Sequence, residues 1–194
     1  MALVLGTSSG FVTSAPTADP TGGSTVDVDG ASVVTKDTSP ADAAKITQIG
    51  WYRNAGTNGA NFEVGLYSEA LGVADALLFV AATNSSTATG WITVTVDWTI
   101  SPSTAYWLAL QMDSHAGSSA IDFEISGGAG IDSRGSQTTL NDPYGGGSVS
   151  DADGMYAIYA LVEAAATGQP TIKRFGGVPH AARLTGGGQT GQNW

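Results

Sequence analysis

The feature that most constrains the fold of this chain is an alternation of apolar and polar residues, with no run at helical spacing. The clearest example runs from Trp91 to Trp98, where Ile92, Val94, Val96 and Trp98 share one face, which we expect to be buried. Successive side chains of a strand point to opposite faces of a sheet, so this period predicts a half-buried β-strand. Similar runs recur from residue 46 onward at spacings of roughly 10 to 20 residues. The pattern predicts an all-β fold: a single antiparallel β-sandwich, jelly-roll-like, with extended N- and C-terminal arms.

Two of these runs predict a hairpin. Residues 46–52 read as a strand, Asn58-Gly59 is a strong turn signal, and residues 62–67 alternate on the return. We therefore expect a β-hairpin with its apolar face inward. Residues 76–82 are a short continuous apolar run, and their length favours a further strand over a helix.

Charge is divided unevenly along the chain. All 17 acidic residues lie at or before Glu163 with four of the seven cations, so residues 1–163 carry −13 and residues 164–194 carry +3. Residues 1–45 are rich in Ser, Thr, Asp, Pro and Gly, which predicts an N-terminal arm with at most one or two edge strands. We expect this arm, a sandwich body over residues 46–163, and a basic, glycine-rich arm over residues 164–194.

Composition also excludes several partners and sites. Seven scattered cations in a chain of net charge −10 cannot form the basic surface that nucleic acid requires. We find neither a secretory signal nor an apolar run of about 18 residues, so we expect no membrane partner and synthesis in the cytoplasm. The chain has no cysteine and two histidines, which excludes disulfides and disfavours zinc, and we expect no cofactor.

Two pairs of aspartates have the spacing of a cation-binding loop. Asp151 and Asp153 precede a glycine, as do Asp27 and Asp29. Neither pair continues into a 12-residue loop with a closing Glu, so a polar turn is the simpler interpretation. We keep Asp151 and Asp153 as weak metal candidates only.

Catalytic motifs are weaker still. Residues 6–10 fit the G-x-S-x-G pattern, but no helix pattern follows, as that chemistry requires. Glu63, Asp122 and Glu124 could pair as carboxylates of a glycosidase, yet they stand where an alternating strand is polar anyway. We expect no catalytic residue and a non-enzymatic protein.

Two tryptophans, Trp91 and Trp107, fall on strand faces that we expect to be outer. Exposed tryptophans can stack on sugar rings, and aromatic residues are also enriched in subunit contacts. A third interpretation is cover by an arm or loop of the same chain, because large aromatic side chains are seldom left bare. The sequence leaves these three interpretations open.

The strands lie in three segments that read ITQIGWYRNAGTNGANFEVGLYS, GWITVTVDWTISPSTAYWLALQMD and MYAIYALVE. Together these segments resemble the jelly-roll modules of uncharacterised proteins from tailed phages and environmental viral sequences, of the virion-associated structural or decoration type. The C-terminal IKRFGGVPH is similar to the short tails that close phage structural proteins. The resemblance implies a virion location, after synthesis in the host cytoplasm, and brings no catalytic residue with it.

These observations lead us to expect a self-assembling virion structural protein, such as a capsid decoration, fibre or tail-associated protein. Its arms would bind neighbouring copies and a major capsid or tail protein. The C-terminal arm offers cations that complement the acidic body, and apolar anchors. These residues are Lys173, Arg174, Phe175, Val178, Pro179, Arg183, Leu184 and Trp194. The alternative is a carbohydrate-binding or receptor-adhesion module that uses Trp91 and Trp107 on a surface glycan.

Overall fold

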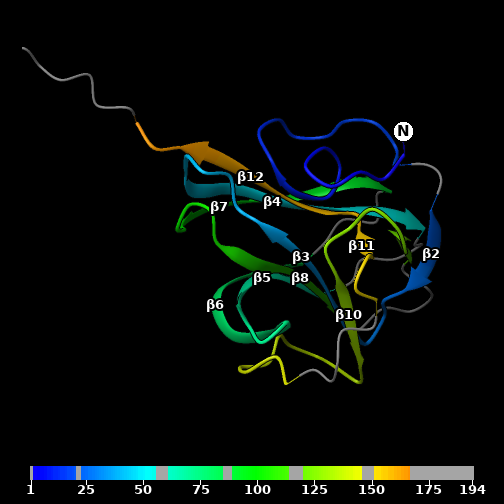
Figure 1. Cartoon of the computed structure of the whole chain (residues 1–194). Coiled ribbons are helices and arrows are strands. Elements are labelled where there is room, and N and C mark those ends of the chain that lie inside the picture. The colour runs from blue at the N-terminus through cyan, green and yellow to red at the C-terminus, as the bar shows by residue number, and fades with distance from the viewer. Residues whose placement is uncertain are drawn as a thin grey trace, which may run out of the picture.

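The computed structural model describes residues 2–20, 23–55, 61–84, 89–113, 120–145 and 151–166. Every regular element in these ranges is a β-strand, and the strands form two sheets of seven and five strands that face each other (Figure 1). The predicted all-β sandwich is confirmed. Within these ranges there is no helix long and apolar enough to cross a membrane.

The seven-stranded sheet is organised around its longest strand, β4. One edge of β4 pairs with β7, and the other edge pairs first with β12 and then with β9. Strand β1 adds to β12 in the sheet's one parallel pairing among the described strands, and β2 and β11 flank β9. The strands are β1 (Gly10–Val12), β2 (Ser24–Asp27), β4 (Ala43–Ala55), β7 (Gly90–Thr99), β9 (Ala120–Glu124), β11 (Met155–Tyr156) and β12 (Ile158–Ala164).

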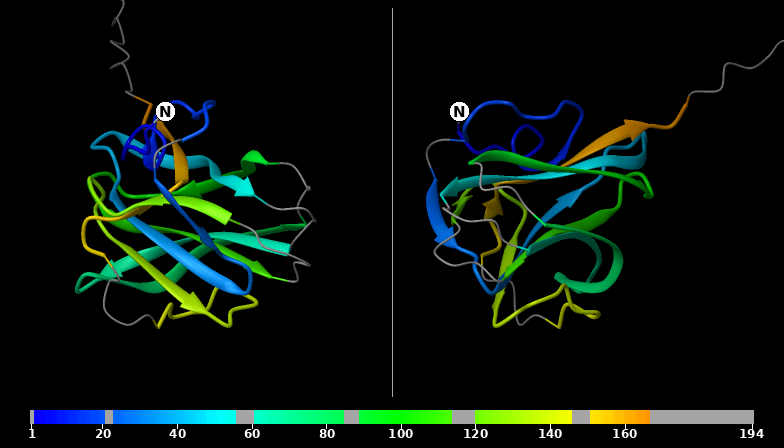
Figure 2. Two further views of the ribbon diagram at one scale, coloured as in Figure 1. Left: turned by 90° about the vertical axis from the view of Figure 1, so that its right-hand side faces the viewer. Right: turned by 180° about the vertical axis from the view of Figure 1, so that it is seen from behind.

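The five-stranded sheet has the order β10-β3-β8-β5-β6, and all its pairs are antiparallel. Its two outer strands are therefore β10 and β6. The strands are β3 (Ala31–Thr38), β5 (Asn61–Ala70), β6 (Val73–Asn84), β8 (Ala105–Asp113) and β10 (Ile131–Gly135). Figure 2 shows this sheet lying below the seven-stranded one, with the two sheets as separate layers.

The main core lies between the sheets, where the alternation of each strand turns one set of side chains inward. Trp51 of β4 and Phe62 of β5 meet there edge to face, with ring centroids 5.7 Å apart. At the side formed by β6 and β7, Phe79 stacks on Trp98 at a centroid distance of 5.5 Å. Trp98 is buried, as the period-two pattern predicted.

The predicted hairpin between residues 46–52 and 62–67 is wrong, although both strands exist. These residues belong to β4 and β5, which lie in different sheets, and the Asn58-Gly59 turn falls outside the described residues. The apolar face of each strand is buried against the opposite sheet, a pairing that local turn signals do not report. The hairpin of this region is instead β5–β6, whose turn residues Leu71 and Gly72 have φ angles of 54° and 90°.

The predicted N-terminal arm is also wrong over much of its length. Strand β3 lies between β10 and β8, so it is an inner strand rather than an edge strand. Val33 and Val34 are buried on its two faces, and Phe11 of β1 is buried as well. These short apolar stretches are stabilised by strands from distant parts of the chain, β8 for β3 and β12 for β1.

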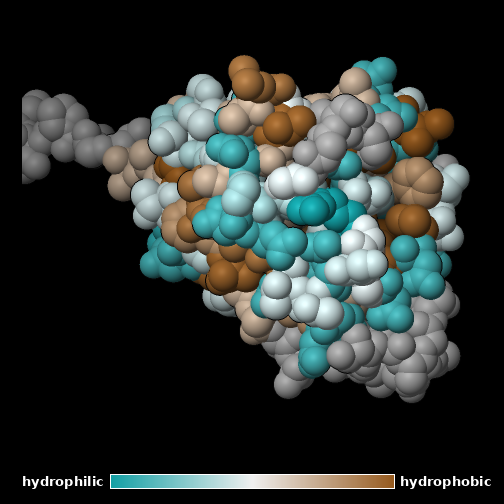
Figure 3. All heavy atoms as spheres, turned by 90° about the horizontal axis from the view of Figure 1, so that it is seen from below, coloured by the Kyte–Doolittle hydropathy of each residue, from teal (hydrophilic) through white to brown (hydrophobic). Residues whose placement is uncertain are grey.

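A second, smaller apolar cluster covers the outer face of the five-stranded sheet. Trp107 and Tyr67 lie on β8 and β5, and Leu140 and Tyr144 come from residues 136–145, which we call the covering segment. Tyr67 and Tyr144 pack edge to face at 5.2 Å, and the Tyr67 hydroxyl donates a hydrogen bond to the carbonyl of Asn141 at 2.7 Å. Seen from below, hydrophobic residues lie in separate groups among hydrophilic ones (Figure 3).

The strand ends define two opposite ends of the sandwich. At one end, Asn61 pairs with both Asn84 and Asp113, and Ala55 pairs with Ala120. At the other end of β4, Ala43 pairs with Ala164. The last described residues, which follow β12, extend away from the body at this second end (Figure 2).

Candidate functional site

Trp107 is fully buried and presents no surface to a ligand. It belongs to the cluster beneath the covering segment, and its indole Nε1 has no hydrogen-bond partner. Of the three interpretations that the sequence left open, cover by a loop of the same chain is therefore confirmed for Trp107. Its burial excludes it from a sugar-stacking surface in this structure.

Trp91 lies half-buried on the outer face of the seven-stranded sheet. Its ring packs edge to face on Tyr52 at 5.3 Å and on Tyr159 at 5.2 Å, and we call these three residues the aromatic cluster. The Trp91 indole donates a hydrogen bond to the carbonyl of Ala18 at 3.0 Å. The N-terminal residues thus cover part of the cluster, above β4 and β12 in Figure 1.

Acidic residues lie beside this cluster. Asp122 of β9 is buried, and it accepts a hydrogen bond from Asn54 Nδ2 at 2.7 Å. Burial raises the pKa of the Asp122 carboxyl, the bond from Asn54 lowers it, and the charge of Asp19 raises it further. Burial also raises the pKa of Tyr52, with a hydrogen bond to Asp19 as a second cause. The alternation of its strand predicted that Asp122 is solvated, and this prediction is wrong, because the side chain is buried and bonded to Asn54.

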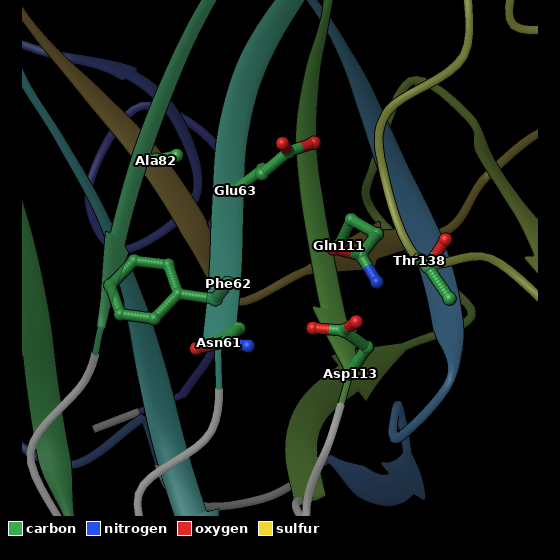
Figure 4. A pocket seen from close by; sticks show the side chains of 7 residues that line it. All are labelled: Asn61, Phe62, Glu63, Ala82, Gln111, Asp113 and Thr138. Carbon is green, nitrogen blue, oxygen red and sulfur yellow. The ribbon is translucent and has the colours of Figure 1, made fainter.

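A polar pocket of about 450 Å³ lies on the outer face of the five-stranded sheet (Figure 4). Strands β5 and β8 form its floor, and the covering segment forms one wall. Phe62 is buried in the core between the sheets, so the pocket surface is made largely of the polar groups. The lining residues are Asn61, Phe62, Glu63, Ala82, Gln111, Asp113 and Thr138.

Two side chains of the polar pocket hold its wall in place. Glu63 Oε2 accepts a hydrogen bond from the backbone N–H of Leu140 at 2.6 Å. Gln111 Nε2 donates to the carbonyl of Gln137 at 2.8 Å. These bonds position Thr138 beside the strands, and Figure 4 shows Glu63 extending from its strand toward the neighbouring strand, which carries Gln111. Among the residues that the structure describes, the polar lining thus comprises two carboxylates, two amides and one hydroxyl, without a cation.

Three cations of the body bind groups outside the polar pocket. Lys36 lies 3.6 Å from Glu69, and Lys45 lies 3.2 Å from Asp97. Arg134 donates a hydrogen bond to a carbonyl of the covering segment. None of these three bonds involves a residue that lines the pocket.

The weak metal candidates form a turn. The backbone N–H of Asp153 donates to Asp151 Oδ1 at 2.8 Å, and the pair at Asp27 and Asp29 does the same at 3.0 Å. Within the described ranges, no group of three or more His, Asp or Glu side chains could hold a metal ion. The polar-turn interpretation fits both pairs.

The serine of the G-x-S-x-G motif, Ser8, forms hydrogen bonds within its own loop. Ser8 is buried, and its Oγ accepts from the N–H of Val4 at 3.0 Å and donates to the carbonyl of Ala2 at 3.4 Å. A nucleophile needs an exposed hydroxyl on a sharp turn before a helix, and this one has neither feature.

The eight residues predicted for the C-terminal arm all lie in 167–194, outside the described residues. Sequence reasoning missed the polar pocket, although Glu63, Gln111 and Asp113 were visible as polar positions on strands. Only the register that brings Asn61 beside Asp113 and Glu63 beside Gln111 puts them together.

Comparison with protein-family models, with curated proteins and with solved structures finds no match to this chain.

Proposed function

We propose that this chain is a non-enzymatic structural protein that assembles from copies of itself. The observation that carries the proposal is one open side of the sandwich, formed by β6 and β7. Among the described strands, β6 pairs with β5 alone and β7 with β4 alone, so both are edge strands. An unpaired strand edge is a template for pairing with another chain.

Much of β6 lacks the charges that usually protect an edge strand. Residues 76–84 of β6 contain no charged residue, and Leu78 and Val80 are 43% and 48% exposed. The inward side chains of β7, Ile92 and Val94 among them, remain only partly buried. Natural monomers usually place charges or proline at such positions, so their absence supports a partner strand at this side.

The covering segment protects only the beginning of β6. The N–H of Leu77 donates to Asp142 Oδ1 at 3.0 Å, and the carbonyl of Asp75 accepts from the N–H of Tyr144 at 2.9 Å. From Leu78 onward, no contact of this kind appears in the described part of the chain. The open stretch thus coincides with the exposed apolar side chains.

The acidic body supports the same proposal through charge. Many carboxylates of the body are exposed, and the cations of residues 164–194 are of the opposite sign. A basic arm can therefore bind the body of a neighbour. We place this assembly in a virion, as a capsid decoration, fibre or tail-associated protein that contacts a major capsid or tail protein, on the resemblance given above.

Light scattering of the full chain over a range of concentrations tests the proposal. We expect assemblies that dissociate on dilution, and we expect Val80→Lys to weaken them because it places a charge in the edge contact. Leu71→Lys is the matched control, since Leu71 is fully exposed at the β5–β6 turn. A full chain that is monomeric throughout, or a Val80→Lys assembly as stable as the parent, would contradict the proposal.

A carbohydrate-binding or receptor-adhesion role is the second proposal, now for Trp91 without Trp107. It is favoured by the position of Trp91 beside the exposed Thr93 and Thr95 on the outer face of β7. A glycan array with the full chain tests it, with Trp91→Ala as the variant that must lose any signal. A blank array, or binding that survives Trp91→Ala, would count against this role.

A further inference from the structure

The polar pocket has the chemistry of a site for a positively charged group. Glu63 and Asp113 supply carboxylates, and Asn61 and Gln111 supply amide oxygens, from two neighbouring strands. Carboxylates bind ammonium and guanidinium groups through charge-assisted hydrogen bonds, which are stronger than neutral ones. Its volume of about 450 Å³ lies within the usual range of ligand sites.

A neutral sugar fits this pocket less well. The one aromatic ring among its lining residues, Phe62, is 2% exposed and packs on Trp51 in the core. The described lining of the pocket therefore offers no ring face on which a sugar could stack. Its carboxylates would moreover find no opposite charge on a neutral ligand.

The chain itself contains cations of the required kind. Lys173, Arg174 and Arg183 lie within residues 164–194, where there is no acidic residue to pair with them. Lys173 and Arg174 are adjacent, and they follow Ala166, the last described residue, by seven and eight positions.

The distance from Ala166 to the polar pocket indicates whether these cations come from the same chain or from a neighbouring copy. A chain of eight residues spans at most about 29 Å. The chain leaves the body beside Ala43, at the start of β4, whereas the pocket lies at the end where β4 finishes. Trp51 of β4, whose ring contacts Phe62 of the pocket, lies eight residues from Ala43, about 26 Å along the strand, and the pocket is on the outer face of the opposite sheet, about 10 Å further. Lys173 and Arg174 would reach the pocket of their own chain only with the connecting residues almost fully extended, so a neighbouring copy is the favoured donor.

We therefore propose that the polar pocket binds Lys173 and Arg174 of a neighbouring copy. This inference rests on the proposed self-assembly and adds the position and direction of one contact. The contact joins one end of a body to the opposite end of the next, so its two surfaces differ. Such heterologous contacts produce a closed ring or an open filament.

Cross-linking in the full chain gives the direct test. Because the chain has no cysteine, two introduced cysteines report a single contact. One copy carries Thr138→Cys at the pocket wall, and the other carries Gly176→Cys close to Arg174. We expect a disulfide-linked pair under mild oxidation, and far less of it in high salt, which screens the charges. The control replaces Thr138→Cys by Ala152→Cys, at an exposed position outside the pocket.

Charge variants give an independent readout. Glu63→Gln with Asp113→Asn should raise the concentration at which assemblies dissociate about tenfold, equivalent to about 1.4 kcal/mol. Asp42→Asn with Asp153→Asn makes the same change of charge at exposed positions and should leave that concentration unchanged. If the pocket variant fails to fold, Lys173→Gln with Arg174→Gln must give the same tenfold effect, since it changes no residue of the body.

The outcomes separate this inference from the function on which it rests. A full chain that does not assemble contradicts the proposed function, and the neighbour contact fails with it. Two results would overturn the pocket contact alone in a chain that does assemble. One is equal cross-linking through Thr138→Cys and Ala152→Cys, and the other is a dissociation concentration that the charge variants leave unchanged.

Discussion

The covering segment gives the sharpest prediction, because Leu140 is one of the side chains that it buries against the sheet. Leu140 is 6% exposed and packs with Trp107 and Tyr67. Its Cδ1 lies so close to Gly65 that a Cβ added there would be 2.6 Å from it. We predict that Leu140→Ala destabilises the protein through loss of this contact.

The magnitude follows from the atoms removed. Three carbons at about 0.8 kcal/mol each give about 2.4 kcal/mol, and the cavity left behind adds to this. The covering segment lies at the surface and can settle onto Gly65, which limits the cavity. We therefore expect a loss of about 2–3 kcal/mol in the free energy of unfolding. For a chain of this length that corresponds to a fall of about 5–10 °C in Tm.

Urea unfolding followed by tryptophan fluorescence measures the loss, because Trp107 lies beneath the segment. Thr139→Ala is the control, since its exposed neighbouring side chain should change stability by less than about 0.5 kcal/mol. The backbone amide at position 140 donates a hydrogen bond to Glu63, and its hydrogen exchange should be faster in Leu140→Ala than in the parent. A loss below about 1 kcal/mol would mean that the segment does not cover the sheet in solution.

Three further changes test other parts of the fold. Gly50→Ala should cost about 1–3 kcal/mol in a thermal melt, because its Cβ would lie 2.5 Å from the ring of Tyr159; an unchanged Tm would contradict this packing. Ser9→Ala should lower the free energy of unfolding in urea by about 1 kcal/mol, since the buried Ser9 hydroxyl donates a hydrogen bond to the carbonyl of Tyr156 at 2.6 Å. An unchanged free energy would mean that this hydroxyl is bonded to water instead. For Asp122 the folded-state pKa is raised, so the folded protein loses stability as pH rises above the usual aspartate range. Asp122→Asn should therefore gain stability relative to the parent from about pH 4 to pH 7, and a constant difference over that range would refute the shift.

Strand periodicity was the part of the fold that could be read without tertiary information. The alternation in β7 correctly predicted that Trp98 is buried. For Trp107 the sequence left three interpretations open, and the structure shows cover by a segment of the same chain. The failures concern pairing. Asn58-Gly59 is a strong local turn signal, yet the strands on either side of it pack in different sheets, because each finds a better partner far along the chain.

The candidate site was less predictable than the fold. Trp107 was chosen as a contact residue for its place on an outer face, but the covering segment, which comes later in the chain, buries it. The polar pocket brings together Glu63, Gln111 and Thr138. Their spacing in the sequence does not predict that they are neighbours. Sites of this kind depend on which strands become neighbours, and a residue's own periodicity carries no information about that choice.

The sequence by itself determined the all-β class, the faces of individual strands and the separation of acidic body from basic tail. These properties follow from local alternation and composition, which need no knowledge of distant contacts. Tertiary structure alone decided that residues 31–38 form an inner strand, that β6 and β7 are left as open edges, and that carboxylates meet in the polar pocket. Each of these results depends on pairing between residues far apart in the chain, where the burial of whole strand faces selects one register among many.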